Sequence, residues 1–402
     1  MFSMFESCES LTSIDVSRFK TSNVIDLSGM FRGRKMTSLN LKSFESSSTI
    51  DISQIFANCW FLETLDLSTF KPADAVDMNK MFYGDNRLTS INLSNFSSKN
   101  AKNLSGMFGG CKTLKSIDLK DFETSLVDTM EGMFVDALDL TILDLSKFSA
   151  NSLTTMKNMF LGCKKLIVHI LNILNIIKIK NNKGLTSINL INFYTSKVTS
   201  MENTFSSCNS LKYLNIDSIS TASVTTMYSM FEGCFALTSL DLSKFSTPKL
   251  TDMHNMFRYC YSLEYIDLST FSTSSVTNMA NLFQNCSSLT SIDISTFQTI
   301  RVTDISQMFR DCKKLEKLDL KNFRTSAAIT VGFMFYQCNS LTSLELGNYF
   351  DLARANSLSS MFYNCTLLTS LDVSRFKTSE MTMMSSAFAL CSSLTSLDVF
   401  WI

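Results

Sequence analysis

The stretch Cys260–Asn285 reads CYSLEYIDLSTFSTSSVTNMANLFQN, and its pattern recurs along most of the 402-residue chain. The cysteines mark the period, because from Cys208 to Cys338 each is followed by the next after 26 residues. Self-similarity at a fixed period of about 20–50 residues is typical of solenoids and other stacked arrays. The sequence therefore predicts a stack of rungs, each rung being one copy of this pattern.

Each rung has two halves with different apolar spacing. The segment LEYIDLS alternates apolar and polar residues, which is the spacing of a half-buried strand. In the second half, Val276, Met279, Leu282 and Phe283 are three or four residues apart or adjacent, like one face of a helix, and Thr273 can cap that helix. We therefore expect an α/β repeat of about sixteen rungs, with a parallel β-sheet on one face and short helices on the other.

Phenylalanine and cysteine define the expected core. A phenylalanine precedes the cysteine position by three residues in nearly every rung, and one rung cannot bury so much apolar surface alone. Equivalent cysteines of adjacent rungs would lie about 4.8 Å apart, which exceeds the roughly 3.8 Å between Cβ atoms of a disulfide. We expect a column of buried free thiols. The chain has no C-x-x-C pair and two histidines, so we expect neither a metal site nor a cofactor.

The strand segment LTSLDLSKF at 237–245, with MF-x-x-C before it and TS-x-V-T-x-M in the following half, closely resembles the BspA-like leucine-rich repeat of surface proteins. The resemblance covers nearly the whole chain. It implies a leucine-rich-repeat-type solenoid that is extracellular or at a cell surface and serves adhesion or host contact. It implies no catalytic residues, so we expect a non-enzymatic scaffold whose partner is a protein or a host cell surface.

Composition limits the partners further. Lys+Arg and Asp+Glu both number 36, and a net charge of zero argues against capture of nucleic acid or of an anionic membrane. The longest apolar run, 166–177, is too short to span a membrane and carries polar residues such as His169. The opening MFSMFESC already lies inside a repeat, so we expect no signal peptide in this chain. Together with the resemblance to surface proteins, this indicates a fragment or the product of an incompletely predicted gene.

The unbroken register predicts a single solenoid over residues 1–402, with one irregular, shortened rung at 164–183. From Cys163 to the equivalent Asn182 there are 19 residues in place of 26. Three interpretations remain open: a degenerate rung, a hinge or recognition insert, or residues translated from AT-rich non-coding DNA.

The residue between the two strand apolar positions should point outward from the sheet. Its acidic members are Asp15, Asp66, Asp118, Asp144, Asp241, Asp267, Asp293, Asp319, Glu345, Asp372 and Asp398. Such a column is either a solvated ladder that keeps the sheet soluble or a contact face for a basic protein. Stacked carboxylates repel one another, so we expect raised proton affinity or bound cations. No histidine or nucleophile accompanies them, which disfavours hydrolysis.

Two structural alternatives rest on other positions. Apolar residues at both ends predict head-to-tail assembly into an extracellular filament, and truncation of a longer gene is the competing interpretation. The expected assembly ends are Met1, Phe2, Phe5, Phe400, Trp401 and Ile402. A threonine column that includes Thr221, Thr247 and Thr273 suggests, more remotely, an ice-binding solenoid, although helix capping explains it too.

Five sequons could carry N-linked glycans if the chain is secreted by a eukaryote. Their asparagines are Asn92, Asn95, Asn103, Asn285 and Asn364.

Overall fold

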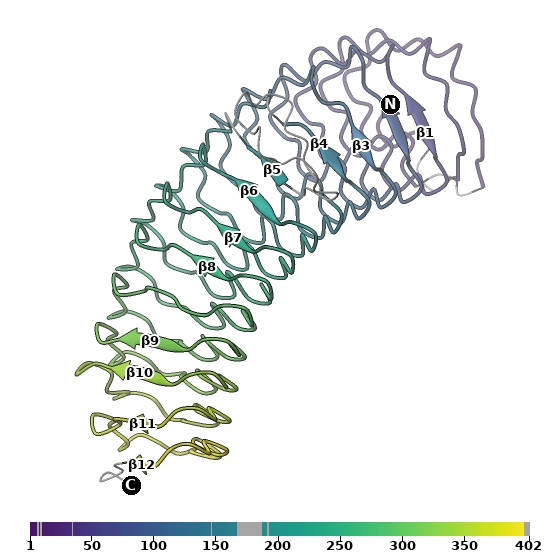
Figure 1. Ribbon diagram of the computed structural model, residues 1–402. Helices are drawn as coiled ribbons and strands as arrows, with labels where there is room; N and C mark the ends of the chain where they lie inside the picture. Colours follow the sequence, from purple (N-terminus) through teal and green to yellow (C-terminus); the bar gives the residue numbers. More distant parts are fainter. Residues whose placement is uncertain are drawn as a thin grey trace, which may run out of the picture. The chain divides into compact units, whose positions relative to one another are not determined.

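The computed structural model describes residues 1–5, 8, 10–33, 35–145, 147–166, 187–190 and 193–397. The chain forms two compact units, of which the first comprises Met1–Val198 and Thr204–Ile219 and the second Thr199–Asn203 and Ser220–Ile402. Within each unit, successive rungs stack on one another (Figure 1). The prediction of one continuous solenoid over 1–402 stays a prediction.

The described residues form twelve short parallel strands, six in each unit. The first unit contains β1 (Thr64–Asp66), β2 (Ser90–Asn92), β3 (Ser116–Ile117), β4 (Ile142–Leu143), β5 (Ser187–Asn189) and β6 (Tyr213–Asn215). The second contains β7 (Ser239–Leu240), β8 (Tyr265–Ile266), β9 (Lys317–Leu320), β10 (Ser343–Leu346), β11 (Ser370–Leu371) and β12 (Ser396–Leu397). They pair as β1–β2, β3–β4, β5–β6, β7–β8, β9–β10 and β11–β12. Paired residues lie one repeat apart, as Leu318 opposite Leu344, so the predicted parallel sheet is confirmed.

The predicted count of sixteen rungs is wrong, because the described residues form about twelve turns that carry a strand. The described residues of the segments that follow Cys8, Gly33 and Cys286 form no strand. A strand of two to four residues depends on very few ladder hydrogen bonds, so the loss of a single pairing removes it.

The register also differs from the prediction between Cys163 and Cys208. The amide of Phe160 donates to the carbonyl of Thr204 at 2.9 Å, and the rings of Phe160 and Phe205 stack at 5.6 Å. These two rungs are therefore direct neighbours at this side of the stack, and no rung is inserted between them there. The predicted irregular rung, 164–183, lies outside the described residues except for its first three.

The prediction of short helices on the second face is wrong, since none of the described residues is helical. Their place is taken by a turn segment, residues 252–260 in one rung, with positive φ at Asn255 (58°) and Tyr259 (62°). A left-handed residue every fourth position ends a right-handed helix after a single turn. The amides of Asn255, Phe257 and Tyr259 donate to the next rung at 2.8–3.0 Å, whereas those of Met256 and Arg258 close turns within their own rung.

Equivalent side chains form columns in the core. Phe231, Phe257, Phe283 and Phe309 are fully buried, and adjacent ring centroids lie 5.6–5.7 Å apart. The Sγ of Cys286 donates to the carbonyl of Phe257 at 3.1 Å. Burial raises the pKa of the Cys286 thiol, which keeps it protonated and unreactive. The predicted phenylalanine core and the column of buried free thiols are confirmed.

The threonines predicted to cap helices instead join adjacent rungs. The Oγ1 of Thr273 donates to the carbonyl of Gln298 at 3.1 Å and accepts from the amide of Gln298 at 2.7 Å. Members of this column are buried, with Thr221, Thr247 and Thr273 at most 1% exposed. Buried hydroxyls cannot contact ice, so the ice-binding interpretation loses its basis.

A carboxyl group interrupts the thiol column of the first unit. Asp85 takes the cysteine position between Cys59 and Cys111 and has no exposed surface. Its Oδ1 accepts from the amide of Cys59 at 2.7 Å, while its Oδ2 makes no hydrogen bond to a described residue. Loss of solvent raises the pKa of Asp85 well above its ordinary value, and the hydrogen bond from Cys59 offsets only part of this rise.

Replacing Phe257 or Phe283 with Ala should lower the free energy of unfolding by about 3–5 kcal/mol, because each change opens a cavity between rungs. Denaturant unfolding measures this loss. Lys244→Ala, at an exposed position, is the control and should change stability little. An unchanged unfolding midpoint for Phe257→Asp would contradict the stacked core.

Replacing Asp85 with Cys should stabilise the first unit at neutral pH by about 1–3 kcal/mol, because it removes an unpaired buried oxygen. The pKa of Asp85 is higher in the folded chain than its ordinary value of 3.8, so the unfolded chain releases the proton more readily. The wild-type chain is thus relatively most stable below pH 3.8 and loses stability as pH rises toward the folded pKa.

Urea unfolding across this pH range measures the effect, and the advantage of Asp85→Cys should grow with pH. Ala137→Cys, at the same column position in the first unit, adds a thiol without removing a charge. Its effect on stability should not depend on pH in this range. If the gain in unfolding free energy from Asp85→Cys did not change with pH, the pKa of Asp85 would not be raised by folding.

Candidate protein-contact face

In most strand segments the outward residue caps the turn that follows it. Oδ1 of Asp241 accepts from the amide of Ser243 at 2.9 Å, and Oδ1 of Asp267 accepts from Ser269 at 2.9 Å. Asn92 makes the same contact in the first unit at 3.1 Å. A short carboxylate or amide side chain suits this Asx turn, which explains why the position is filled by Asp or Asn in most rungs. The Asp and Asn side chains of this column therefore stabilise turns of the fold, whether or not they also bind a partner.

The structure places the predicted contact residues as follows. Asp267 is half-buried, and Asp398 lies outside the described residues. The exposed members are Asp15, Asp66, Asp118, Asp144, Asp241, Asp293, Asp319, Glu345 and Asp372.

Raised proton affinity is the wrong expectation for Asp241, Asp267 and Asp293, because the pKa of each carboxyl is lowered. The backbone hydrogen bond from Ser243 lowers the pKa of Asp241, and the one from Ser295 lowers that of Asp293. At Asp267 the charges of both neighbours act in the opposite direction, yet the hydrogen bonds from the serine that follows it still lower the pKa. An amide donor at 2.9 Å favours the charged form more than solvent-screened neighbours disfavour it. Asp241, Asp267 and Asp293 are therefore ionised at neutral pH.

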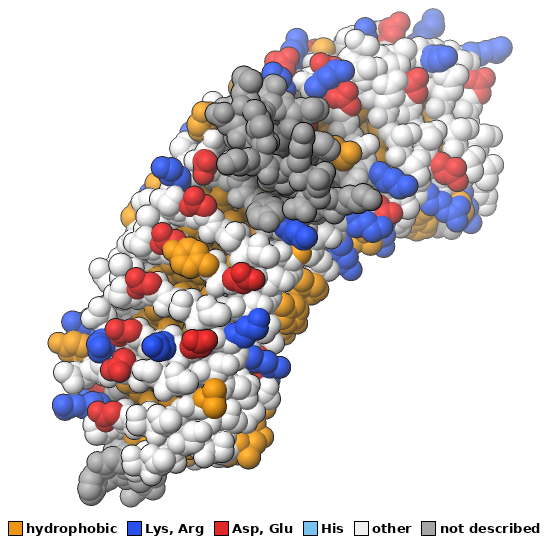
Figure 2. Space-filling view, in the orientation of Figure 1, with side chains coloured by type: hydrophobic (Ala, Val, Ile, Leu, Met, Phe, Trp, Pro, Cys, Tyr) orange, Lys and Arg blue, Asp and Glu red, His pale blue; other side chains and the backbone are white. Residues whose placement is uncertain are grey.

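Basic side chains interrupt the acidic column in part of the second unit. Nζ of Lys321 lies 3.8 Å from Asp319 and 3.9 Å from Glu345. Figure 2 shows basic and acidic side chains side by side at β9 and β10. By contrast, Asp241, Asp267 and Asp293 take part in no ion pair with a described residue. We call these three residues the acidic patch.

An exposed aromatic side chain lies in the strand next to this patch. Tyr265, in β8, is 62% exposed and precedes Asp267 by two residues, so both side chains point to the same face. Sequence reasoning missed it. The signal was available, because Tyr265 occupies a position that is Ser239 in the previous rung and Ser291 in the next.

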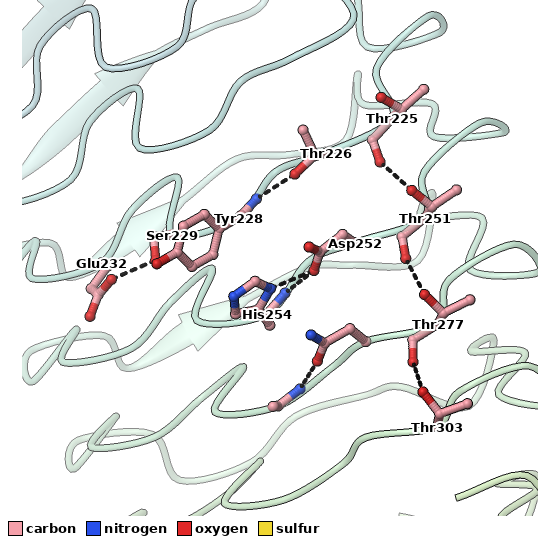
Figure 3. Close-up of polar contacts among 12 residues, drawn as sticks. Thr225, Thr226, Tyr228, Ser229, Glu232, Thr251, Asp252, His254, Thr277 and Thr303 are labelled. Atoms are coloured by element: carbon pink, nitrogen blue, oxygen red, sulfur yellow. Dashed lines mark hydrogen bonds and ion pairs between the residues drawn. The ribbon is translucent and has the colours of Figure 1, made fainter.

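A column of exposed threonines in the second unit forms hydrogen bonds to the backbone of neighbouring rungs (Figure 3). The Oγ1 of Thr251 donates to the carbonyl of Thr225 at 2.9 Å, and the contact repeats in the following rungs. Next to it, Nδ1 of His254 lies 2.6 Å from Oδ1 of Asp252, and the His254 ring stacks on Tyr228 at 4.0 Å. Asp252 also accepts from the His254 amide at 3.1 Å, so this pair closes a turn.

The predicted assembly ends are only partly described. Phe2 is 68% exposed, while Phe5 stacks on Phe31 at 6.0 Å. The amino group of Met1 donates to the carbonyl of Asp26 at 2.8 Å. Phe400, Trp401 and Ile402 lie outside the described residues.

The sequon asparagines occupy turns or outward positions. Asn92 and Asn103 use their side-chain oxygens to cap turns. Asn95, Asn285 and Asn364 have positive φ, and of these Asn95 is exposed. Their glycosylation stays a prediction.

Within the described ranges, no three His, Cys, Asp or Glu side chains are grouped to hold a metal ion. No helix that could cross a membrane occurs in the part of the chain that the structure describes.

Comparison with known proteins adds a family match. The model of a family described as "Mycoplasma protein of unknown function, DUF285" matches residues 1–116, 76–187, 175–266, 262–366 and 344–399. No curated protein matches the chain.

Several solved structures of leucine-rich repeat proteins are similar to the chain. A protein from Bacteroides ovatus is 18% identical, with a TM-score of 0.36, over 86% of this chain and 81% of its own. One from Eubacterium ventriosum is 15% identical, with a TM-score of 0.33, over 91% and 85%. A leucine rich cell surface protein from Faecalibacterium prausnitzii is 13% identical, with a TM-score of 0.33, over 85% and 80%.

Proposed function

The chain belongs to the family described as Mycoplasma protein of unknown function, DUF285, and we propose that it is a non-catalytic scaffold that binds a basic protein segment through its acidic patch. The resemblance to BspA-like leucine-rich repeats, drawn from the 26-residue repeat, is confirmed. The proposal also includes a position at the cell surface and a role in adhesion.

The observation that carries the proposal is the geometry of Asp241, Asp267 and Asp293. Buried Leu240 and Ile266 fix the strand segments, and the amide two residues after each carboxylate orients its side chain. Three ionised groups are thus held in a row, one rung apart, which corresponds to about 4.8 Å between parallel strands. Their mutual repulsion opposes ionisation at Asp267 and is relieved when a cation is placed between them.

Tyr265 supplies an anchor for the same partner. An exposed tyrosine beside carboxylates can hold a Lys or Arg side chain by cation–π contact while the carboxylates pair with its charge. Tyrosine is also among the residues that most often dominate binding at protein interfaces. A basic, extended peptide segment therefore fits this face better than an acidic or purely apolar one.

The filament alternative stays a prediction. Phe2 and Met4 are exposed on the first rung, but the opposite assembly end falls outside the described residues.

Replacing the acidic patch by Asp241→Asn, Asp267→Asn and Asp293→Asn should weaken binding of a synthetic lysine-rich peptide at least about tenfold, equal to about 1.4 kcal/mol. Asparagine keeps the turn cap, as Asn92 does, so the fold should persist. Calorimetry or fluorescence anisotropy measures binding, and raised salt should weaken the wild-type interaction. Tyr265→Ala should weaken binding further.

The matched control removes three charges elsewhere in the second unit, by Asp252→Asn, Asp304→Asn and Glu380→Gln. If binding depended only on the net charge of the chain, both triple variants would lose affinity equally. That result would contradict the proposal that the acidic patch is the binding site. Equal affinity for a glutamate-rich peptide would contradict it too.

A further inference from the structure

One rung of the second unit carries an extra residue. Cys338 and Cys365 are 27 residues apart, whereas the cysteines from Cys208 to Cys338 follow one another after 26. Leu346 still pairs with Leu320, and Phe350 again stacks on Phe376 at 5.9 Å, so the extra residue falls between Leu346 and Phe350. A Cβ on Gly347 would collide with the backbone carbonyl of Lys321. The inserted turn therefore needs glycine there and is closely packed on the previous rung.

The insertion displaces Tyr349 onto the surface, over the previous rung. Tyr349 is 55% exposed, and the guanidinium of Arg324 lies 4.4 Å from its ring centroid. The amide of Thr325 donates to the carbonyl of Tyr349 at 3.1 Å, which fixes the turn in place. The aromatic ring and the guanidinium are thus held in one arrangement before any ligand is present.

This pair forms one wall of an open groove of about 480 Å³. Its other lining residues include Ser295, Gln298, Ile300 and Asn322. A volume within about 300–1,000 Å³ is usual for a small-molecule site. The groove lies beyond the ends of the strands and differs from the acidic patch in residues and in charge.

The groove contains unused donors and no carboxylate. Arg324 forms no ion pair with a described residue, and its guanidinium makes no hydrogen bond within the described part of the chain. Asn322 donates to the carbonyl of Ser295 at 3.1 Å, whereas the Gln298 side-chain amide makes no hydrogen bond to a described residue. The two nearest acids along the chain, Asp293 and Asp351, do not line the groove. Asp293 accepts from the Ser295 amide, and Asp351 pairs with Nζ of Lys377 at 2.9 Å.

These groups match one ligand chemistry. A guanidinium presents parallel donors to a carboxylate, and amide groups both donate to and accept from hydroxyls. Tyr349 and Ile300 offer apolar surface for the C–H groups of a ring. We propose that this groove binds an acidic sugar, with its carboxylate on Arg324 and its hydroxyls on Gln298 and Asn322.

Ligand-observed NMR titration with sodium glucuronate tests the proposal on the full chain. Glucose, which has the ring without the carboxylate, and acetate, which has the carboxylate without the ring, are the comparison probes. The chain should bind glucuronate at least about tenfold more tightly than either, since both kinds of contact contribute. No glucuronate binding, or acetate binding as tightly as glucuronate, would overturn the assignment.

Arg324→Gln should weaken glucuronate binding at least about tenfold, because it removes the charge-assisted pair. Arg354→Gln makes the same charge change at an exposed position of the second unit outside the groove, and its affinity should equal that of the wild type. Tyr349→Leu should weaken binding through loss of the stacked arrangement. Equal losses in Arg324→Gln and Arg354→Gln would overturn the proposal. Unchanged melting curves would confirm that the variants fold.

Discussion

The hydrogen bonds that each turn segment donates to the next rung are the constraint on which the rest of the structure depends. They require positive φ at two residues of the segment, four positions apart. They also give buried amides a partner that a helix would have supplied within the rung. Because each joins a residue to the one just before its equivalent in the next rung, they also fix the register. Phe257 must then lie over Phe283, and Cys286 meets the carbonyl of Phe257. Core packing follows from backbone pairing.

Because the register repeats, equivalent residues of successive rungs form columns along the surface. A surface region differs from the rest only where the residue type in a column changes from one rung to the next. Most outward aspartates serve first as turn caps, and a cap alone carries no recognition. The second unit becomes distinctive where Tyr265 replaces a serine and where the carboxylates form no ion pair with a described lysine. The groove at Arg324 and Tyr349 likewise exists because one rung is one residue longer. Departures from the repeat, rather than the repeat itself, therefore locate the candidate sites.

Spacing alone predicted the parallel strands, the buried phenylalanine and cysteine columns and the outward aspartates. It could not separate a helix from a stack of turns, since apolar residues three or four apart suit both. The distinguishing signal lies one and five residues before the cysteine, where residues such as Gly233 and Asn281 tolerate positive φ. The sequence predicted raised pKa values for the outward aspartates because it shows only that carboxylates are neighbours. The group that lowers the pKa of Asp267 is the backbone amide two residues further along the chain, which a side-chain pattern does not reveal.

Scalar couplings across hydrogen bonds, measured by NMR, test the turn-segment ladder most directly. The account predicts coupling from the amide nitrogen of Phe257 to the carbonyl carbon of Leu282 and from Asn281 to Ser306, each in the next rung. A coupling from Phe257 to Met253, four residues earlier, would instead show a helix and contradict the account.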